Sequence, residues 1–139
     1  MNTSLSPISD PIIKRGEVIC STKDIQAGGL AYRFQIICGQ ITAFPGMNAD
    51  EDDYLPAFLI QFGEEYFAYL NRCAHVAMEL DWNPGEVFDI EREHLVCATH
   101  YAVYDPRSGK CLRGPCPKGA QLIALPITIK DELIFFAPL

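Results

Sequence analysis

The chain has 139 residues, 49% of them apolar, and a formal net charge of −7, which predicts one globular domain with a core of its own. This acidity argues against a nucleic-acid partner, because phosphate backbones attract Lys and Arg. It is compatible with simple solubility or with steering toward a basic protein. We see no apolar run of membrane-spanning length and no signal peptide, so we expect a soluble, cytoplasmic protein without a membrane segment.

Short β-branched and aromatic runs, separated by Gly, Pro, Asn and Asp, dominate the sequence. They predict an all-β fold, a small antiparallel sandwich or barrel. The expected strands are residues 17–21, 30–38, 57–62, 65–70, 95–97, 102–104, 122–126 and 133–137. Gly63 and Glu64 predict a hairpin turn. We expect residues 1–15 to be a flexible tail of this single domain, 1–139.

Two segments interrupt the strand pattern. The acidic run within residues 46–56 is expected to be a solvated loop, with a docking patch as the alternative. Residues 81–92 contain the turn sequence Asn83-Pro84-Gly85. This second segment either shapes a partner surface or braces the loops around it, and the sequence does not choose between these two roles.

Two short motifs, NRCAH and VCATH, carry the chemistry. They contain Cys73, His75, Cys97 and His100, and two thiols with two imidazoles indicate a metal site. Structural zinc sites usually space paired ligands two to four residues apart, which fits Cys73 and His75 poorly. The spacing favours loops that each give a Cys to one iron and a His to the other, as in a [2Fe–2S] centre with two His ligands. A zinc-binding structural module is the alternative.

The residues after His100 extend this pattern. The run YAVYDPRSGKCLRGP, from Tyr101 to Pro115, resembles the second cluster loop, short strand and Gly-Pro loop of the Rieske iron–sulfur family. The likeness is densest over residues 71–117, which we expect to form the cluster-binding subdomain. It implies one [2Fe–2S] cluster per chain, held by the four residues of the two motifs.

The resemblance also implies a function. The chain is similar to the soluble ferredoxin components of multicomponent oxygenases, which carry single electrons between redox proteins. A small Rieske subunit of a larger reductase, such as nitrite reductase, is the alternative. We expect no small-molecule substrate and no enzyme activity from the chain alone. A terminal oxygenase would need a mononuclear iron with two His and a carboxylate, and no His follows His100.

Five neighbours are expected to surround the cluster, namely Tyr101, Ala102, Tyr104, Gly114 and Pro115. High-potential family members have a Ser and a Tyr hydroxyl at the positions of Ala102 and Tyr104. Because only the second donor is present, we expect a low to intermediate potential. Tyr101 stands where the family usually has Gly, a residue that allows a tight loop.

The remaining cysteines and histidine are expected to have structural roles. Cys20 and Cys38 lie in apolar runs and are expected to be buried. Cys111 and Cys116 are expected to be packed free thiols, with a disulfide or reserve ligands as alternatives. His94 is expected to be a surface residue.

The family's high-potential members also tie their two cluster loops together with a disulfide. The matching positions here are Met78 and Thr99, so the resemblance implies that this bridge is absent.

Overall fold

The computed structural model describes residues 10–41, 50, 52–74, 78–117 and 119–138. This part of the chain forms three antiparallel sheets, which confirms the all-β expectation. The central sheet has the order β2 (Tyr32–Ile37), β3 (Tyr54–Phe62), β4 (Glu65–Leu70) and β8 (Ala124–Leu125). The second has the order β1 (Val18–Ser21), β10 (Leu133–Phe136) and β9 (Ile127–Lys130). The third has the order β5 (Leu95–Val96), β6 (Val103–Tyr104) and β7 (Cys111–Arg113).

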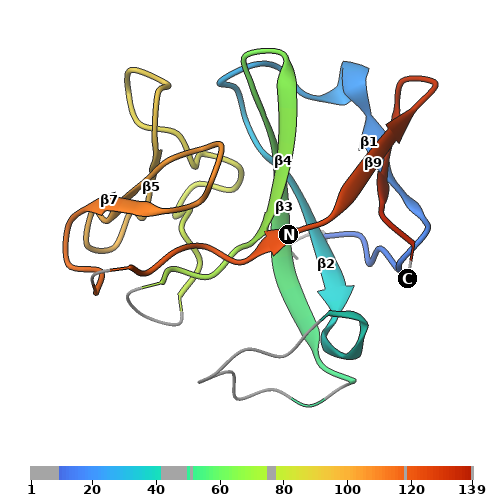
Figure 1. Cartoon of the computed structure of the whole chain (residues 1–139), viewed down its shortest axis with the longest axis horizontal. Helices are drawn as coiled ribbons and strands as arrows, with labels where there is room; N and C mark the ends of the chain where they lie inside the picture. The colour runs from blue at the N-terminus through green and yellow to red at the C-terminus, as the bar shows by residue number, and fades with distance from the viewer. Residues whose placement is uncertain (1–9, 42–49, 51, 75–77, 118, 139) are drawn as a thin grey trace, which may run out of the picture.

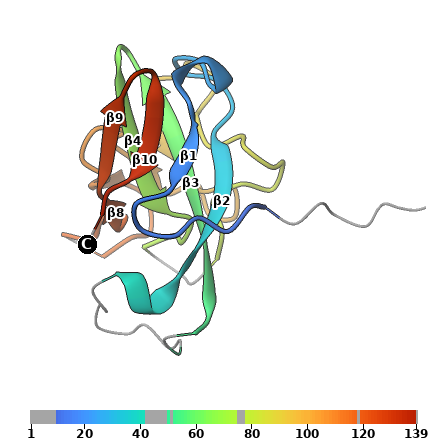
Figure 2. The ribbon, with the colours of Figure 1, turned by 90° about the vertical axis from the view of Figure 1, so that its right-hand side faces the viewer.

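The β3–β4 hairpin stands in the middle of the molecule. The sheet with β1, β9 and β10 lies on one side of it, and β5 and β7 lie on the other (Figures 1 and 2). Alternate residues of β3 therefore enter different cores, since successive strand side chains point to opposite faces. Leu59 belongs to the core shared with Phe34 and Ile134. Ile60 belongs to a second core, under β5 and β6.

Most expected strands are confirmed with small changes at their ends. β4 has the expected bounds, and β3 begins at Tyr54, three residues before its expected start. Gly63 forms the expected hairpin turn with a φ of 62°. Two strands were not expected from the sequence. β7 is a largely exposed CLR segment of three residues, too short to show an alternation. β9 does alternate apolar and polar residues (ITIK), but it is short, follows directly after Pro126 and has only its first residue part-buried.

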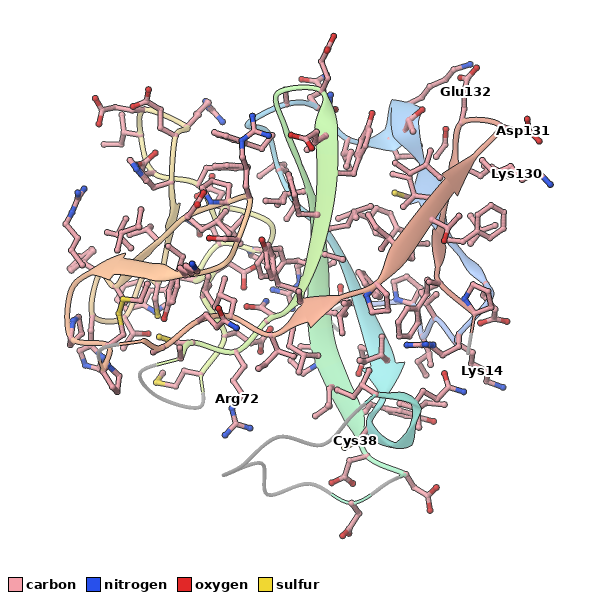
Figure 3. All side chains as sticks on the ribbon, in the orientation of Figure 1. Lys14, Cys38, Arg72, Lys130, Asp131 and Glu132 are labelled. Carbon is pink, nitrogen blue, oxygen red and sulfur yellow. A yellow bond between two sulfur atoms is a disulfide. The ribbon has the colours of Figure 1, made fainter. Side chains whose placement is uncertain are left out.

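The β9–β10 hairpin turns through Asp131 and Glu132, whose φ angles are 52° and 65°. Positive φ at both central residues is typical of a type I′ turn. Figure 3 places this turn at the opposite end of the molecule from β5 and β7. Two short 3₁₀ turns, Thr22–Asp24 and Cys38–Gln40, complete the described secondary structure.

Residues 10–15 differ from the expected flexible tail, of which residues 1–9 lie outside the description. Ile13 is buried, and its amide donates to the carbonyl of Gln35 at 2.8 Å. The acidic run is described only in part, and there the amide of Asp50 donates to the Asp53 carboxylate at 2.9 Å. Across the described ranges, no helix is long and apolar enough to span a membrane.

Candidate metal centre

The first candidate loop follows β4. Asn71 is almost fully buried, and its side-chain oxygen accepts from the Leu80 amide at 2.8 Å. The Cys73 amide donates to the Met78 carbonyl at 2.8 Å. These two bonds fold the chain back on itself and hold the Cys73 backbone in place. His75 lies outside the described residues, so its position stays an expectation.

The second candidate loop joins β5 to β6. The Cys97 amide donates to the Ala102 carbonyl at 2.9 Å, and the Tyr101 amide donates to the Cys97 carbonyl at 2.8 Å. His100 is exposed within this closed loop. Tyr101 has a φ of 62°, in the left-handed region that favours Gly. A tyrosine thus adopts this conformation at the position where the resemblance implies a glycine, and its side chain is 71% exposed.

The two loops bring two thiols together in the core beneath the third sheet. Cys73 is 3% exposed and Cys97 is fully buried. The pKa of the Cys97 thiol is raised, first by burial and then by the adjoining Cys73 side chain, and the hydrogen bond from the Thr99 backbone amide offsets only part of this shift. Two buried thiolates side by side are costly without a cation, so this pair suits a cationic metal core.

Tyr104 places its hydroxyl against the first loop. The ring is fully buried, and the oxygen lies 3.1 Å from the Cys73 sulfur and accepts from the Ala74 amide at 3.0 Å. Because the amide occupies an acceptor position, the phenolic hydrogen is left for the sulfur. Burial first, and then the bond to Cys73, raise the pKa of Tyr104. The hydroxyl therefore stays protonated and able to donate.

The Gly-Pro loop rests on the second candidate loop. A Cβ atom on Gly114 would lie 2.8 Å from Cα of Ala102, and Gly114 has a φ of 104°. Only glycine fits this close approach. Ala102 is itself fully buried and has no side-chain donor. The Gly-Pro loop is thus packed directly on the second candidate loop, with Pro115 exposed beside Gly114.

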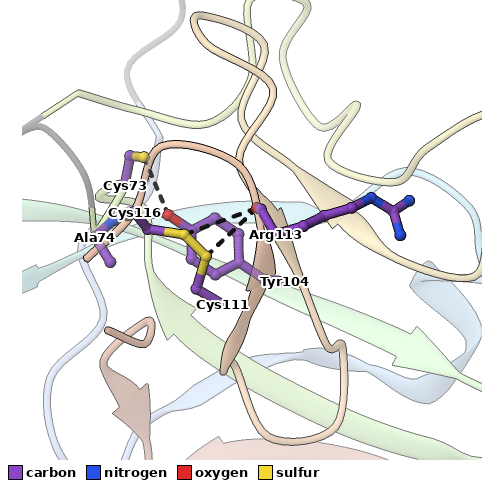
Figure 4. Close-up of a disulfide and its surroundings, with 6 residues drawn as sticks. All are labelled: Cys73, Ala74, Tyr104, Cys111, Arg113 and Cys116. Carbon is purple, nitrogen blue, oxygen red and sulfur yellow. Dashed lines mark hydrogen bonds between the residues drawn. A yellow bond between two sulfur atoms is a disulfide. The ribbon is translucent and has the colours of Figure 1, made fainter. Parts of the chain in front are cut away.

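The expectation of free thiols at Cys111 and Cys116 is wrong. The two residues form a disulfide, with their Cα atoms 6.6 Å apart, inside the usual range for such bonds (Figure 4). The pairing arises because the chain turns at Gly114 after β7 and returns Cys116 beside Cys111. Cys20 and Cys38 are buried outside any disulfide, as expected.

A buried polar network braces the segment after the first loop. The Asp81 side chain is fully buried and accepts from Arg33 at 2.9 Å, from the Asn71 amide group at 2.9 Å and from the Gly85 backbone at 2.7 Å. The carbonyl of Gly85 accepts in turn from the Ala31 amide at 2.8 Å. Segment 81–92 is therefore tied to β2 and to the first loop, which favours the role of a brace.

Sequence reasoning missed Asn71, Asp81 and Arg33 as supporting residues. Asn71 stands inside the NRC motif, so its nearness to Cys73 was an available signal. Nothing along the chain connects Arg33 with the other two. His94, expected at the surface, is about a third exposed and lies 3.2 Å from the Asp89 carboxylate.

Met78 and Thr99 stand where the resemblance places the loop-tying disulfide of high-potential members, and both line a surface groove of about 490 Å³ with Trp82. The hydroxyl of Thr99 is buried and has no hydrogen-bond partner among the described residues. An orphaned polar atom directly before His100 fits a loop shaped around a bound group. Together with the thiol pair and the Tyr104 donor, it makes this chain compatible with a metal cluster.

Within the described ranges, no three Cys, His, Asp or Glu side chains are grouped as a metal site. The structure brings together Cys73 and Cys97, places His100 on the same loop as Cys97, and does not describe His75. An all-β domain with paired thiols, a Cys-x-x-His loop and a covering Gly-Pro loop defines the class of iron–sulfur electron-transfer proteins.

Comparisons with known proteins give the particular family. The family model of the Rieske [2Fe-2S] domain matches residues 16–126. The chain therefore belongs to the Rieske family, and membership implies a single [2Fe–2S] cluster.

A stretch of 63 residues is 32% identical to the cytochrome b6-f complex iron-sulfur subunit of Synechococcus elongatus, covering 45% of this chain and 31% of that one. The chain thus spans about a third of the length of the curated relatives that it matches.

Two solved structures share the fold at low identity. The ferredoxin of carbazole 1,9a-dioxygenase from Nocardioides aromaticivorans IC177 is 20% identical with a TM-score of 0.58, covering 88% of this chain and 97% of that chain. A chain from a complex of reduced oxygenase and oxidized ferredoxin in carbazole 1,9a-dioxygenase is 15% identical, also with a TM-score of 0.58. That match covers 86% of this chain and 98% of the other.

Proposed function

We propose that this protein is a one-electron carrier that holds its [2Fe–2S] cluster on Cys73, His75, Cys97 and His100. The observation that carries the proposal is the pair of buried thiols from two loops, with the Tyr104 hydroxyl on one sulfur. The bound cluster supplies reversible one-electron chemistry. The subdomain that we assign to it is residues 71–117.

The protein's own residues have separate tasks in this proposal. Cys73 and Cys97 supply anionic sulfur from the core side, where water is excluded. His100 is exposed, so its imidazole stands on the side from which a partner approaches. Tyr104 donates a hydrogen bond to sulfur, which stabilises the more negative, reduced state. Ala102 adds no such donor, so we propose a potential in the lower to middle part of the range of about −150 to +300 mV.

The partners that we propose are redox proteins. One of the structures with this fold is described as a complex of an oxygenase with a ferredoxin, which supports a carrier that meets its acceptor transiently. A cytoplasmic location, expected from the sequence, stays part of the proposal, and cell fractionation would test it.

The partial match to an iron-sulfur subunit favours a second candidate, a subunit of a larger assembly. Affinity purification from the native cell separates these two functions. A stoichiometric, salt-resistant companion would favour the subunit, whereas weak, salt-sensitive binding to a reductase or oxygenase would favour the carrier.

The three histidines of the chain provide the test of the site. We would measure iron, sulfide and the EPR spectrum of dithionite-reduced protein for the variants His75→Ala, His100→Ala and His94→Ala. The proposal expects two irons and two sulfides in the parent and in His94→Ala, with a Rieske-type signal of low average g. Both other variants should lose that signal. Colourless parent protein with stoichiometric zinc, or a signal that depends on His94, would refute the assignment.

A further inference from the structure

The Cys111–Cys116 disulfide closes a small ring around the Gly-Pro loop. The two cysteines are five positions apart, and Gly114 lies between them. Gly114 approaches the backbone of Ala102 so closely that no Cβ atom would fit. The disulfide-closed ring is therefore in direct contact with the loop that carries Cys97 and His100.

The disulfide also packs against the candidate metal centre. Both of its cysteines are part-buried against the core that contains Cys73, Cys97 and Tyr104. Figure 4 shows the two sulfurs beside the Tyr104 ring, whose hydroxyl points at Cys73. A change in the conformation of the disulfide-closed segment, residues 111–116, can therefore shift the Tyr104 side chain and change its hydrogen bond to Cys73.

The bond lies within reach of a reductant. Residues 112–115 between the two cysteines are all exposed, and Leu112 is 52% exposed. Because the stabilisation by a disulfide grows with the length of the loop that it closes, so short a ring contributes less to overall folding than a long one would. Its opening is expected to release the loop and leave the two cores of the protein intact.

We propose that Cys111 and Cys116 form a thiol–disulfide exchange site, which takes a dithiol as its reductant and controls how firmly the Gly-Pro loop holds the second candidate loop. A thiolate of the dithiol attacks one sulfur, and the Cys111–Cys116 bond breaks to give a mixed disulfide. The second thiol of the reductant resolves it. Two electrons and two protons end on Cys111 and Cys116, and the dithiol becomes a disulfide.

The exchange site does not depend on the cluster, but its effect on the cluster rests on the function proposed above. With the ring open, the Gly-Pro loop loosens and Tyr104 holds the Cys73 sulfur less firmly. A weaker hydrogen bond to sulfur destabilises the reduced state. Reduction of the disulfide is therefore expected to lower the midpoint potential of the cluster.

The first experiment maps thiols without reference to the cluster. The protein is purified without reductant and divided into two samples, one of which is treated with dithiothreitol. Both samples are then denatured and alkylated, and the masses of the cysteine-containing peptides are measured by mass spectrometry. Cys111 and Cys116 are expected to be protected at first and to gain one alkyl group each after treatment. Cys20 and Cys38, which lie outside any disulfide, should be alkylated in both samples and serve as the internal control for the alkylation reaction. Full alkylation of Cys111 and Cys116 before treatment would overturn the proposal.

The second experiment measures the cluster by protein-film voltammetry, which needs no dithionite. The parent is compared before and after dithiothreitol, beside the double variant C111S/C116S. The variant Leu112→Ser, at an exposed β7 residue next to Cys111, is the matched control. A lower potential after treatment is expected in the parent and in Leu112→Ser. The double variant should show the low potential with or without treatment.

An unchanged potential in the parent, with the disulfide shown to be open, would overturn the proposal that this disulfide controls the potential of the cluster. A parent that contains no cluster would instead refute the proposed function, and the alkylation result would still decide whether the exchange site exists.

Discussion

The hydroxyl of Tyr104 lies 3.1 Å from the sulfur of Cys73, although 31 positions separate the two residues in the chain. The same hydroxyl accepts from the Ala74 amide at 3.0 Å. One buried tyrosine thus joins the strand after the second candidate loop to the backbone and the thiol of the first.

Replacement of Tyr104 by Phe should lower the midpoint potential of the cluster, because it removes a donor that stabilises the reduced state. The matched control is Tyr69→Phe. Tyr69 is equally buried, but its hydroxyl donates to the Pro106 carbonyl at 2.7 Å. This control should cost about 1 kcal/mol of stability and leave the potential unchanged. Voltammetry of both variants is the measurement, and an unchanged potential in Tyr104→Phe would rule out the contact with sulfur.

Tyr101→Gly should stabilise the protein by about 0.5–1 kcal/mol, because glycine adopts a φ of 62° without the steric cost that tyrosine bears. Tyr101→Ala keeps the Cβ atom that causes this cost, and we expect no gain from it. Anaerobic urea unfolding of the two variants gives the comparison. Equal effects of Gly and Ala would assign any change to the lost aromatic ring and not to the backbone.

Asp81→Asn should destabilise the protein by about 3 kcal/mol. The substitution replaces one of two buried acceptor oxygens by an amide NH2 group, which cannot accept from the N–H donors around it. Glu79 contacts the same Arg33 guanidinium at 3.1 Å, but its side chain is 45% exposed. Glu79→Gln should therefore cost less than about 1 kcal/mol. Urea unfolding of both variants measures the difference, and similar costs would contradict a bracing role specific to Asp81.

The Cys20 thiol should resist alkylation in the folded protein. Burial first, and then the charge of Asp24, raise the pKa of Cys20 to about 12, against about 8.5 for an ordinary thiol. At pH 8 the reactive thiolate should thus be roughly a thousandfold scarcer than in unfolded protein. The rate of iodoacetamide labelling at this residue, in native and in urea-unfolded samples, is the measurement.

The same pKa sets a pH dependence of stability. The unfolded state releases the Cys20 proton above about pH 8.5, whereas the folded state keeps it until about pH 12. The contribution of Cys20 is therefore fully present below pH 8.5 and is lost as the pH rises through this window. A stability difference between the parent and Cys20→Ala that stays constant from pH 8 to pH 10 would contradict the raised pKa.

The sequence by itself determined the all-β class, most of the strands, the two Cys-His motifs and the Gly-Pro loop. These features are local, because strand alternation and turn residues act over a few positions along the chain. The same reasoning expected β4 with its observed bounds. It missed β7, which has only three residues, and β9, whose short ITIK alternation follows directly after Pro126.

Only the tertiary structure decided which distant groups meet. The bonds of Asp81 to Arg33 and to Asn71 join segments 48 and 10 positions away. The Cys111–Cys116 pairing depends on how the chain turns at Gly114, and the Tyr104 contact depends on two loops packing over one core. Such contacts have no periodic signal in the sequence, because a hydrogen bond or a disulfide requires two groups to be close in space and not at any set spacing along the chain.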